Sequence, residues 1–288
     1  MGELAPILVI IGPTASGKSA LAMAVARRAG AEILSVDSMQ VYRGMDIGTA
    51  KPSAAEQAQV PHHLLDLVRP DEVFTVARFV ESADRAIVDA AARNKPLIAT
   101  GGTPLYYKAL FEGLFDGPGA DAEVRHRLMQ LPSGELARRL AEVDPPAASR
   151  IHVNDLKRLV RALEVFELTG RPLSAWQREH AFAHPRHRAR LVAIPCDGTT
   201  LTERIRKRVQ DWLAAGWVEE VEGLLAGGHG EARAMGSVGY AQVRATLAGA
   251  LPGEELENTI VRATRVFARR QRTWLNHADV VWLGDTPA

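Results

Sequence analysis

The chain has 288 residues, a formal net charge of +1, 47% apolar residues and 24% charged residues. These values are typical of a folded protein with room for one large domain or for a core with a smaller insert. The single cysteine, Cys196, excludes an internal disulfide framework and a thiolate metal cluster. No segment approaches the roughly 20 apolar residues of a membrane-spanning helix, and the N-terminal apolar run is too short for a signal sequence. We therefore expect a cytoplasmic protein that does not enter a membrane.

The N-terminal segment ILVIIGPTASGKS, residues 7–19, predicts a phosphate-binding loop. Residues 7–11 are an apolar run typical of a buried strand, and alanines and leucines at helical spacing over 18–29 predict the helix that follows. The loop between strand and helix carries the residues of the phosphate-binding pattern, Gly12, Gly17, Lys18 and Ser19. Its backbone N–H groups and lysine suit phosphate oxygens, and its hydroxyl suits Mg2+.

Further strands and helices alternate along the next part of the chain. EILSVD (32–37) predicts a strand that ends on Asp37, a helix follows at about 75–93, and PLIATGGT (96–103) predicts a strand that ends in a glycine pair. This order predicts a parallel α/β sheet, in which ligands bind at the carboxyl ends of the strands. The phosphate-binding loop, Asp37 and the glycine pair should therefore face one crevice.

The pattern changes after about residue 114. Residues 115–187 begin with turn formers and then have a helical pattern, whereas RLVAIPCD (190–197) predicts a strand that returns to the sheet. We therefore expect a P-loop NTPase-like core, with a parallel sheet flanked by helices, from residues 1–114 and 188–288. Residues 115–187 should form an all-helical insertion domain.

Basic residues are concentrated in two segments. Residues 150–190 hold nine Lys or Arg against four Asp or Glu, and residues 261–276 hold five arginines and no acid. Four arginines of the second segment fall on one helix face: Arg262, Arg265, Arg269 and Arg272. Such segregated charge suits a polyanion, and an ordinary solvated helix face explains it equally well.

The phosphate-binding loop first suggests a kinase or ATPase, and a small-molecule kinase is one hypothesis. Such enzymes usually have a second acid at a strand end, and Asp37 is the only acid at the tip of an early strand. Asp37 suits a general base, and Thr103 suits a group that orients a nucleophile, although both residue types also cap helices and turns. Arg204 and Arg208, four residues apart, could clamp a diphosphate. A non-enzymatic RNA-binding module is a further alternative. His62 and His63 follow a proline without nearby metal-ligand partners, which favours a packing role.

Seven motifs in order resemble those of the tRNA dimethylallyltransferases, also called tRNA isopentenyltransferases. They are GPTASGKS, SVDSMQVYRGMDIGTAKP, PHHLLDL, GGTPLYYKAL, RIHVNDLKRLVRALEVFELTG, SVGYAQV and RRQRTWL, and they span about residues 7–276. The resemblance implies transfer of a dimethylallyl group from dimethylallyl diphosphate to N6 of adenosine 37 in tRNAs that read codons beginning with U. It implies the tRNA anticodon stem-loop and dimethylallyl diphosphate as partners and Mg2+ as cofactor, and we expect a monomer.

The residue patterns and the resemblance together assign roles to individual positions. Asp37, Thr103 and Lys18 would be catalytic, and Ser19 would bind Mg2+. The diphosphate would be held by Gly12, Pro13, Thr14, Ala15, Ser16, Gly17, Lys18 and Ser19, with Arg204 and Arg208. The tRNA would be contacted by Asp37, Ser38, Met39, Gln40, Thr103, Arg125, Lys157, Arg158, Leu159, Val160, Arg161, Gly236, Ser237, Val238, Gly239, Tyr240, Ala241, Gln242, Arg269, Arg270, Gln271 and Arg272. The chain departs from the family pattern at Lys157, where many members have Gln, and at Asn276, where many have a basic residue.

Overall fold

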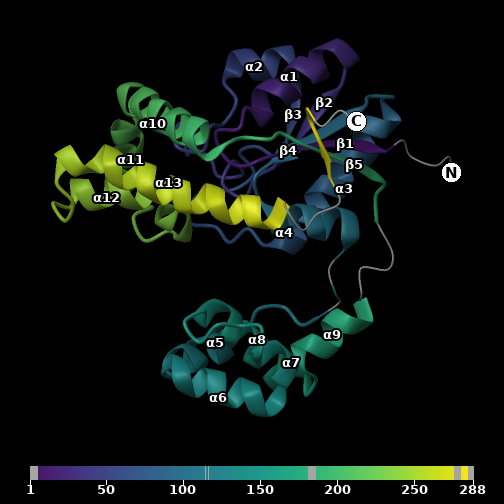
Figure 1. Cartoon of the computed structure of the whole chain (residues 1–288), viewed down its shortest axis with the longest axis vertical. Helices are drawn as coiled ribbons and strands as arrows, with labels where there is room; N and C mark the ends of the chain where they lie inside the picture. Colours follow the sequence, from purple (N-terminus) through teal and green to yellow (C-terminus); the bar gives the residue numbers. More distant parts are fainter. Residues whose placement is uncertain (1–5, 114, 116, 181–185, 276–279, 285–288) are drawn as a thin grey trace. The chain divides into compact units, whose positions relative to one another are not determined.

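The computed structural model describes residues 6–113, 115, 117–180, 186–275 and 280–284. The chain forms two compact units, one of Met1–Phe111 with Arg186–Ala288 and the other of Glu112–Pro185 (Figure 1). The expectations that concern Asn276 lie outside the described residues.

The first unit is built on a six-stranded sheet in the order β3-β2-β4-β1-β5-β6. Every neighbouring pair of strands is parallel. The strands are β1 Ile7–Ile11, β2 Glu32–Val36, β3 His62–His63, β4 Leu97–Gly101, β5 Ala189–Ala193 and β6 Val281–Trp282. The predicted fold class, a parallel sheet of the P-loop type flanked by helices, is confirmed.

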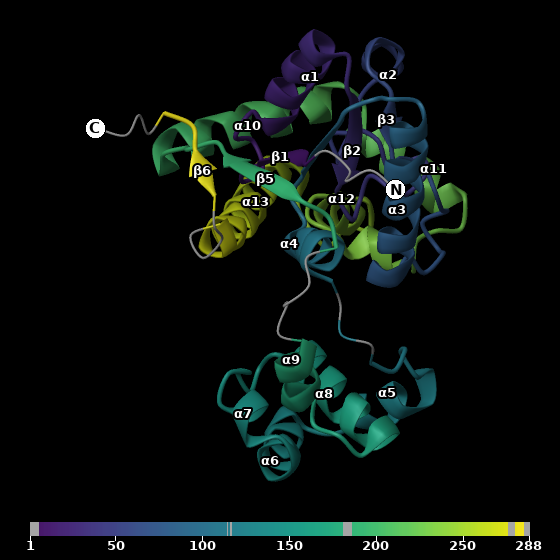
Figure 2. The ribbon, with the colours of Figure 1, turned by 90° about the vertical axis from the view of Figure 1, so that its right-hand side faces the viewer.

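Helices cover both faces of this sheet because the central strands are apolar on both sides. Ile10, Ile33 and Ile98 pack against α1, Lys18–Ala29. The opposite face packs against α3, Val76–Ala92, and α4, Pro104–Tyr107, which continues as the π-helical turn η1, Lys108–Glu112. Figure 2 shows α1 and α4 on opposite sides of the sheet.

A helical layer follows β5 in the same unit. It consists of α10 Gly198–Ala214, α11 Trp217–Ala226, the short η2 Arg233–Gly236, α12 Tyr240–Leu247 and α13 Gly253–Leu275. Its core includes Trp217 and Tyr240, whose rings meet edge to face with centroids 5.7 Å apart. Asp197 starts α10 by accepting hydrogen bonds from the N–H groups of Thr199 and Thr200.

In the described residues of the second unit, the regular structure is helical. Its helices are α5 Ala122–Met129, α6 Ser133–Val143, α7 Pro145–Ala148, α8 Leu156–Thr169 and α9 Leu173–His180. Leu128, Leu136, Leu140 and Leu163 form part of a separate apolar core. Asp155 caps the start of α8, and Gly170 ends this helix in the left-handed conformation.

The strands at the two edges of the sheet were not expected from the sequence. Strands β3 and β6 have two residues each, which is too short for a periodic pattern to reveal them. The strand expected over 190–197 begins at Ala189 and ends at Ala193, since Pro195 and the helix cap Asp197 follow it. Among the described residues, no helix is both long enough and apolar enough to cross a membrane.

Candidate active site

The phosphate-binding loop connects β1 to α1 and is shaped by two residues with positive φ, Ala15 at 64° and Gly17 at 94°. No side chain caps α1, so the first N–H groups of this helix remain available to an anion. A Cβ atom on Gly12 would lie 2.5 Å from Ser16 Oγ, so a larger residue here would displace this hydroxyl. The Ser16 hydroxyl is buried and has no hydrogen-bond partner among the described residues.

Lys18 lies at the start of α1, with its Nζ atom 3.4 Å from the carbonyl oxygen of Pro13. Desolvation lowers the pKa of Lys18 to about 8, opposed by the nearby charge of Asp37 and reinforced by that of Arg208. An anion bound in the loop would stabilise the charged ammonium of Lys18. P-loop lysines pair with phosphate oxygens in this way.

Two arginines of α10 reach the same loop. Arg204 donates to the carbonyl oxygen of Ser16 and Arg208 to Thr14 Oγ1, both at 3.4 Å. Burial lowers the pKa of Arg208. The loop, Lys18 and both predicted arginines therefore belong to one cationic site.

Asp37 and Thr103 follow neighbouring strands and meet at the same edge of the sheet. A Cβ atom on Gly101 would lie 2.1 Å from the carbonyl oxygen of Val36, so this glycine permits the close approach. The Ser38 N–H donates to Thr103 Oγ1 at 3.0 Å, and the Met39 N–H donates to Asp37 Oδ1 at 2.8 Å. The Thr103 hydroxyl thus holds the Asp37 loop.

Desolvation raises the pKa of Asp37, while the Met39 N–H and the charge of Lys18 oppose this shift. The turn at Gly102 and Thr103 lies beside both groups: a Cβ atom on Gly102 would lie 3.9 Å from Lys18 Nζ, and Thr103 contacts the Asp37 loop. The carboxylate is therefore next to the cationic site. Group-transfer enzymes use such a carboxylate as a general base for the attacking group, and they use an anion site to bind the leaving group.

The side-chain amide of Gln40, a predicted tRNA contact, is used inside the protein. Ser35 Oγ donates to Gln40 Oε1 at 2.7 Å, and Gln40 Nε2 donates to the carbonyl oxygens of Thr49 and Ala50 at 3.1 and 3.0 Å. Gln40 therefore fixes the loop that begins at Asp37.

In the predicted tRNA-binding segment Gly236–Gln242, several groups are also engaged internally. Gln242 Oε1 accepts from the Gly239 N–H at 2.7 Å, and the Tyr240 hydroxyl donates to Glu220 Oε1 at 2.6 Å. A Cβ atom on Gly239 would lie 2.0 Å from the Trp217 ring, so this segment packs directly on the indole.

In the helical unit, Arg125 and Arg161 both bind Glu164, whose side chain is fully buried. The two arginines lie 2.8 and 2.7 Å from the carboxylate oxygens, and Glu164 Oε1 also accepts from the Asp121 N–H. These hydrogen bonds keep the pKa of Glu164 low against the opposing effect of burial, which is the largest single influence on it.

The other residues of this unit that were predicted to contact tRNA differ in their burial. The side chains of Leu159 and Val160 lie in the apolar core, whereas Lys157 and Arg158 are exposed at the start of α8. A polyanion therefore has access to the two charged side chains.

On α13, Arg269, Arg270 and Arg272 are exposed, whereas Gln271 is buried. Arg272 lines a cavity of about 280 Å³ with Pro13, Cys196 and Trp282. Gln271 therefore differs in burial from the three arginines, although all four residues were predicted to contact tRNA.

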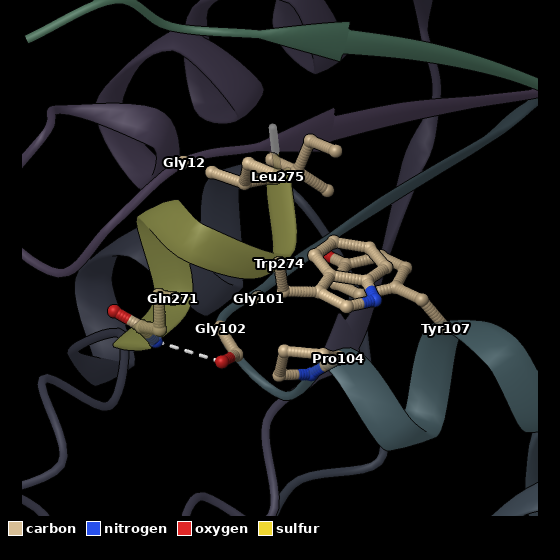
Figure 3. Close-up of a pocket in the computed structure, with 9 residues that line it drawn as sticks. Gly12, Gly101, Gly102, Pro104, Tyr107, Gln271, Trp274 and Leu275 are labelled. Carbon is tan, nitrogen blue, oxygen red and sulfur yellow. Dashed lines mark hydrogen bonds between the residues drawn. The ribbon is translucent and has the colours of Figure 1, made fainter. Parts of the chain in front are cut away.

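A second, much smaller pocket of about 10 Å³ lies beside the phosphate-binding loop (Figure 3). Gly12 and Gly102 line it together with Tyr107 and Trp274, whose rings stack with centroids 5.9 Å apart. Neither aromatic residue was expected to have a role, although Tyr107 lies in GGTPLYYKAL and Trp274 in RRQRTWL. Their place in the pocket depends on packing between α4 and α13.

The chain is similar to known proteins over nearly its whole length. The sequence model of the IPP transferase family matches residues 40–278. A tRNA dimethylallyltransferase of Sorangium cellulosum is 50% identical over 98% of this chain and 90% of its own length. One of Geobacter metallireducens is 49% identical over 98% of this chain and 93% of its own length.

Solved structures are similar as well. A tRNA isopentenylpyrophosphate transferase of Bacillus halodurans has a TM-score of 0.72 and 34% identity, and the match covers 96% of this chain and 89% of that one. A eukaryotic dimethylallyltransferase described as acting on tRNA has a TM-score of 0.82 and 26% identity, covering 97% and 74% respectively. The chain described here therefore belongs to the IPP transferase family.

Proposed function

We propose that this protein transfers the dimethylallyl group of dimethylallyl diphosphate to N6 of adenosine 37 in tRNAs that read codons beginning with U. The products are N6-(dimethylallyl)adenosine and diphosphate. One observation carries the proposal: the phosphate-binding loop after β1 and Asp37 after β2 lie on either side of the Gly102–Thr103 turn after β4. Lys18 Nζ lies 3.9 Å from the Cβ position of Gly102, and Thr103 Oγ1 accepts from the Ser38 N–H beside Asp37. Family membership agrees with this reaction.

The cationic site would hold the diphosphate, which is the leaving group. The allylic C–O bond breaks and its electron pair remains on the diphosphate. Backbone N–H groups of the loop, Lys18, Arg204 and Arg208 stabilise that growing negative charge. The arginines are pre-placed by their bonds to the loop, so little reorganisation is needed.

Asp37 would act on the adenine, which is the nucleophile. The adenine amine is a weak nucleophile, because its lone pair is delocalised into the ring. As the N6–C bond forms, the amine proton moves to the Asp37 carboxylate. The raised pKa of Asp37 makes it a stronger base than an exposed aspartate. Thr103 would keep the carboxylate in place through its bond to the Ser38 N–H.

The donor set at the loop also fits Mg2+. Ser19 is exposed in the first turn of α1, and its hydroxyl, with phosphate oxygens and water, supplies the oxygen ligands that Mg2+ prefers. Ser19 would hold the ion, which would add positive charge beside the leaving group. In the described part of the chain, His, Cys, Asp and Glu side chains form no group of three suited to a metal.

The tRNA would bind through the exposed basic residues of both units. Lys157, Arg158, Arg269 and Arg270 are exposed and could contact phosphates, which set the position of an RNA without reading its sequence. Adenosine 37 is stacked in the anticodon loop, so it would be turned out of the stack to reach Asp37.

Direct titration of dimethylallyl diphosphate and of ATP, each with Mg2+, tests the choice of donor. We expect the prenyl diphosphate to bind more tightly. A clear preference for ATP would support the kinase hypothesis instead and would contradict this proposal.

A further inference from the structure

Gln271 connects the phosphate-binding loop to the turn that carries Thr103. Its Oε1 atom accepts from the Thr14 N–H at 2.8 Å, and its Nε2 atom donates to the carbonyl oxygen of Gly102 at 2.7 Å. Figure 3 shows the second bond. Gln271 therefore bridges segments that are 257 and 169 residues away in sequence.

The bridge is closely packed. Gln271 is only 5% exposed, and a Cβ atom on Gly102 would lie 2.4 Å from its Nε2 atom. That Cβ position is also 3.9 Å from Lys18 Nζ, so the bridge ends beside the catalytic lysine. Thr14 is held a second time by Arg208, through its side chain. Two helices thus converge on one residue of the loop.

We propose that Gln271 is a positioning residue that holds the phosphate-binding loop in the conformation that binds the donor, and is not itself a tRNA contact. The inference rests on the proposed function. A buried amide with bonds at both ends cannot reach an RNA, whereas the loss of either bond would leave a buried polar group unsatisfied and free the loop at Thr14.

An alternative role for Gln271 is to block the donor site, and this role predicts the opposite change in donor binding. If Gln271 Oε1 occupied a place meant for a phosphate oxygen, its removal would strengthen donor binding. The second bond to Gly102 argues against this role, because it fixes the amide independently of Thr14.

Two substitutions break the bridge from its two sides. Gln271→Met keeps the volume and removes both hydrogen bonds, and Gly102→Ala displaces the amide through the added Cβ atom. The matched control is Arg270→Ala, at the exposed neighbouring position of the same helix. The affinity of each free protein for dimethylallyl diphosphate with Mg2+, and separately for an anticodon stem-loop, is measured by calorimetry, with thermal unfolding as a check of folding.

We expect Gln271→Met and Gly102→Ala each to weaken donor binding about tenfold, as the loss of one or two hydrogen bonds would, with RNA affinity unchanged. The double variant should be no weaker than the single ones, because both substitutions break the same bridge. Arg270→Ala should weaken only RNA binding.

Unchanged or tighter donor binding in Gln271→Met, or a loss confined to RNA binding, would overturn the inference. If Gln271→Met does not fold, the same two affinities of Gly102→Ala are the deciding measurement. Unchanged or tighter donor binding, or a loss confined to RNA binding, would then overturn the inference. Failure of the unmodified protein to bind the prenyl diphosphate would instead overturn the proposed function.

Discussion

Under the proposed function, the ionisation of Lys18 should make donor binding depend on pH. Desolvation lowers the pKa of this lysine to about 8 in the free protein. Bound diphosphate favours the charged ammonium and raises its pKa, so donor binding takes up a proton whenever the free lysine is neutral. Affinity should therefore be near its plateau at about pH 7, above the ionisation of the phosphate ester at about pH 6, and should fall as the pH rises through about 8.

The size of the effect follows from the fraction of charged lysine. At about pH 9, one unit above the pKa, about one tenth of the lysine is charged, so the affinity should be about tenfold below its plateau, or about 1.4 kcal/mol. Calorimetric titration with dimethylallyl diphosphate at fixed Mg2+ measures this. The ester is preferred to free diphosphate because it lacks the last ionisation of the free anion.

Substitutions test whether Lys18 causes the pH dependence of donor affinity. Lys18→Met should weaken binding at every pH and remove the decline, while Lys207→Met, at an exposed position paired with Asp211, should leave the profile unchanged. A flat profile in the unmodified protein, or a decline that persists in Lys18→Met, would refute the reasoning.

Three further predictions concern catalysis, folding and RNA binding. Asp37→Asn should reduce single-turnover transfer by about 10²–10⁴-fold with tRNA affinity retained, and near-normal turnover would remove the general base. Glu164→Ala should destabilise the helical unit in thermal unfolding by about 3 kcal/mol, the low end for a broken buried pair because its arginines keep some contact with water. The control Glu167→Ala, which breaks the exposed pair with Arg127, should cost about 0–1 kcal/mol, and equal losses would show that burial does not matter. Arg269→Ala should lower the salt dependence of tRNA affinity by about one ion, and an unchanged slope would exclude a phosphate contact.

The sequence was most informative where local pattern determines structure. The phosphate-binding loop follows from its glycines and its place between strand and helix, and the strand-end position of Asp37 follows from the parallel order. The approach of Thr103 to the Asp37 loop agrees with that expectation and depends on Gly101.

Long-range partners could not be predicted. Nothing local indicates that Gln271 bridges Thr14 and Gly102, because those partners are distant in the chain. Motif matching likewise grouped Leu159 and Val160 with their exposed neighbours, although the helical period turns these two side chains into the core.

The central claim is that a prenyl group passes from the phosphate-binding loop to an adenine facing Asp37. The most direct measurement is incubation of the protein with labelled dimethylallyl diphosphate, Mg2+ and an anticodon stem-loop, with the modified nucleotide located by mass spectrometry. The account predicts label on N6 of adenosine 37, and none on a stem-loop with guanosine at that position. Absence of label from the adenosine substrate, or label at another nucleotide, would contradict it.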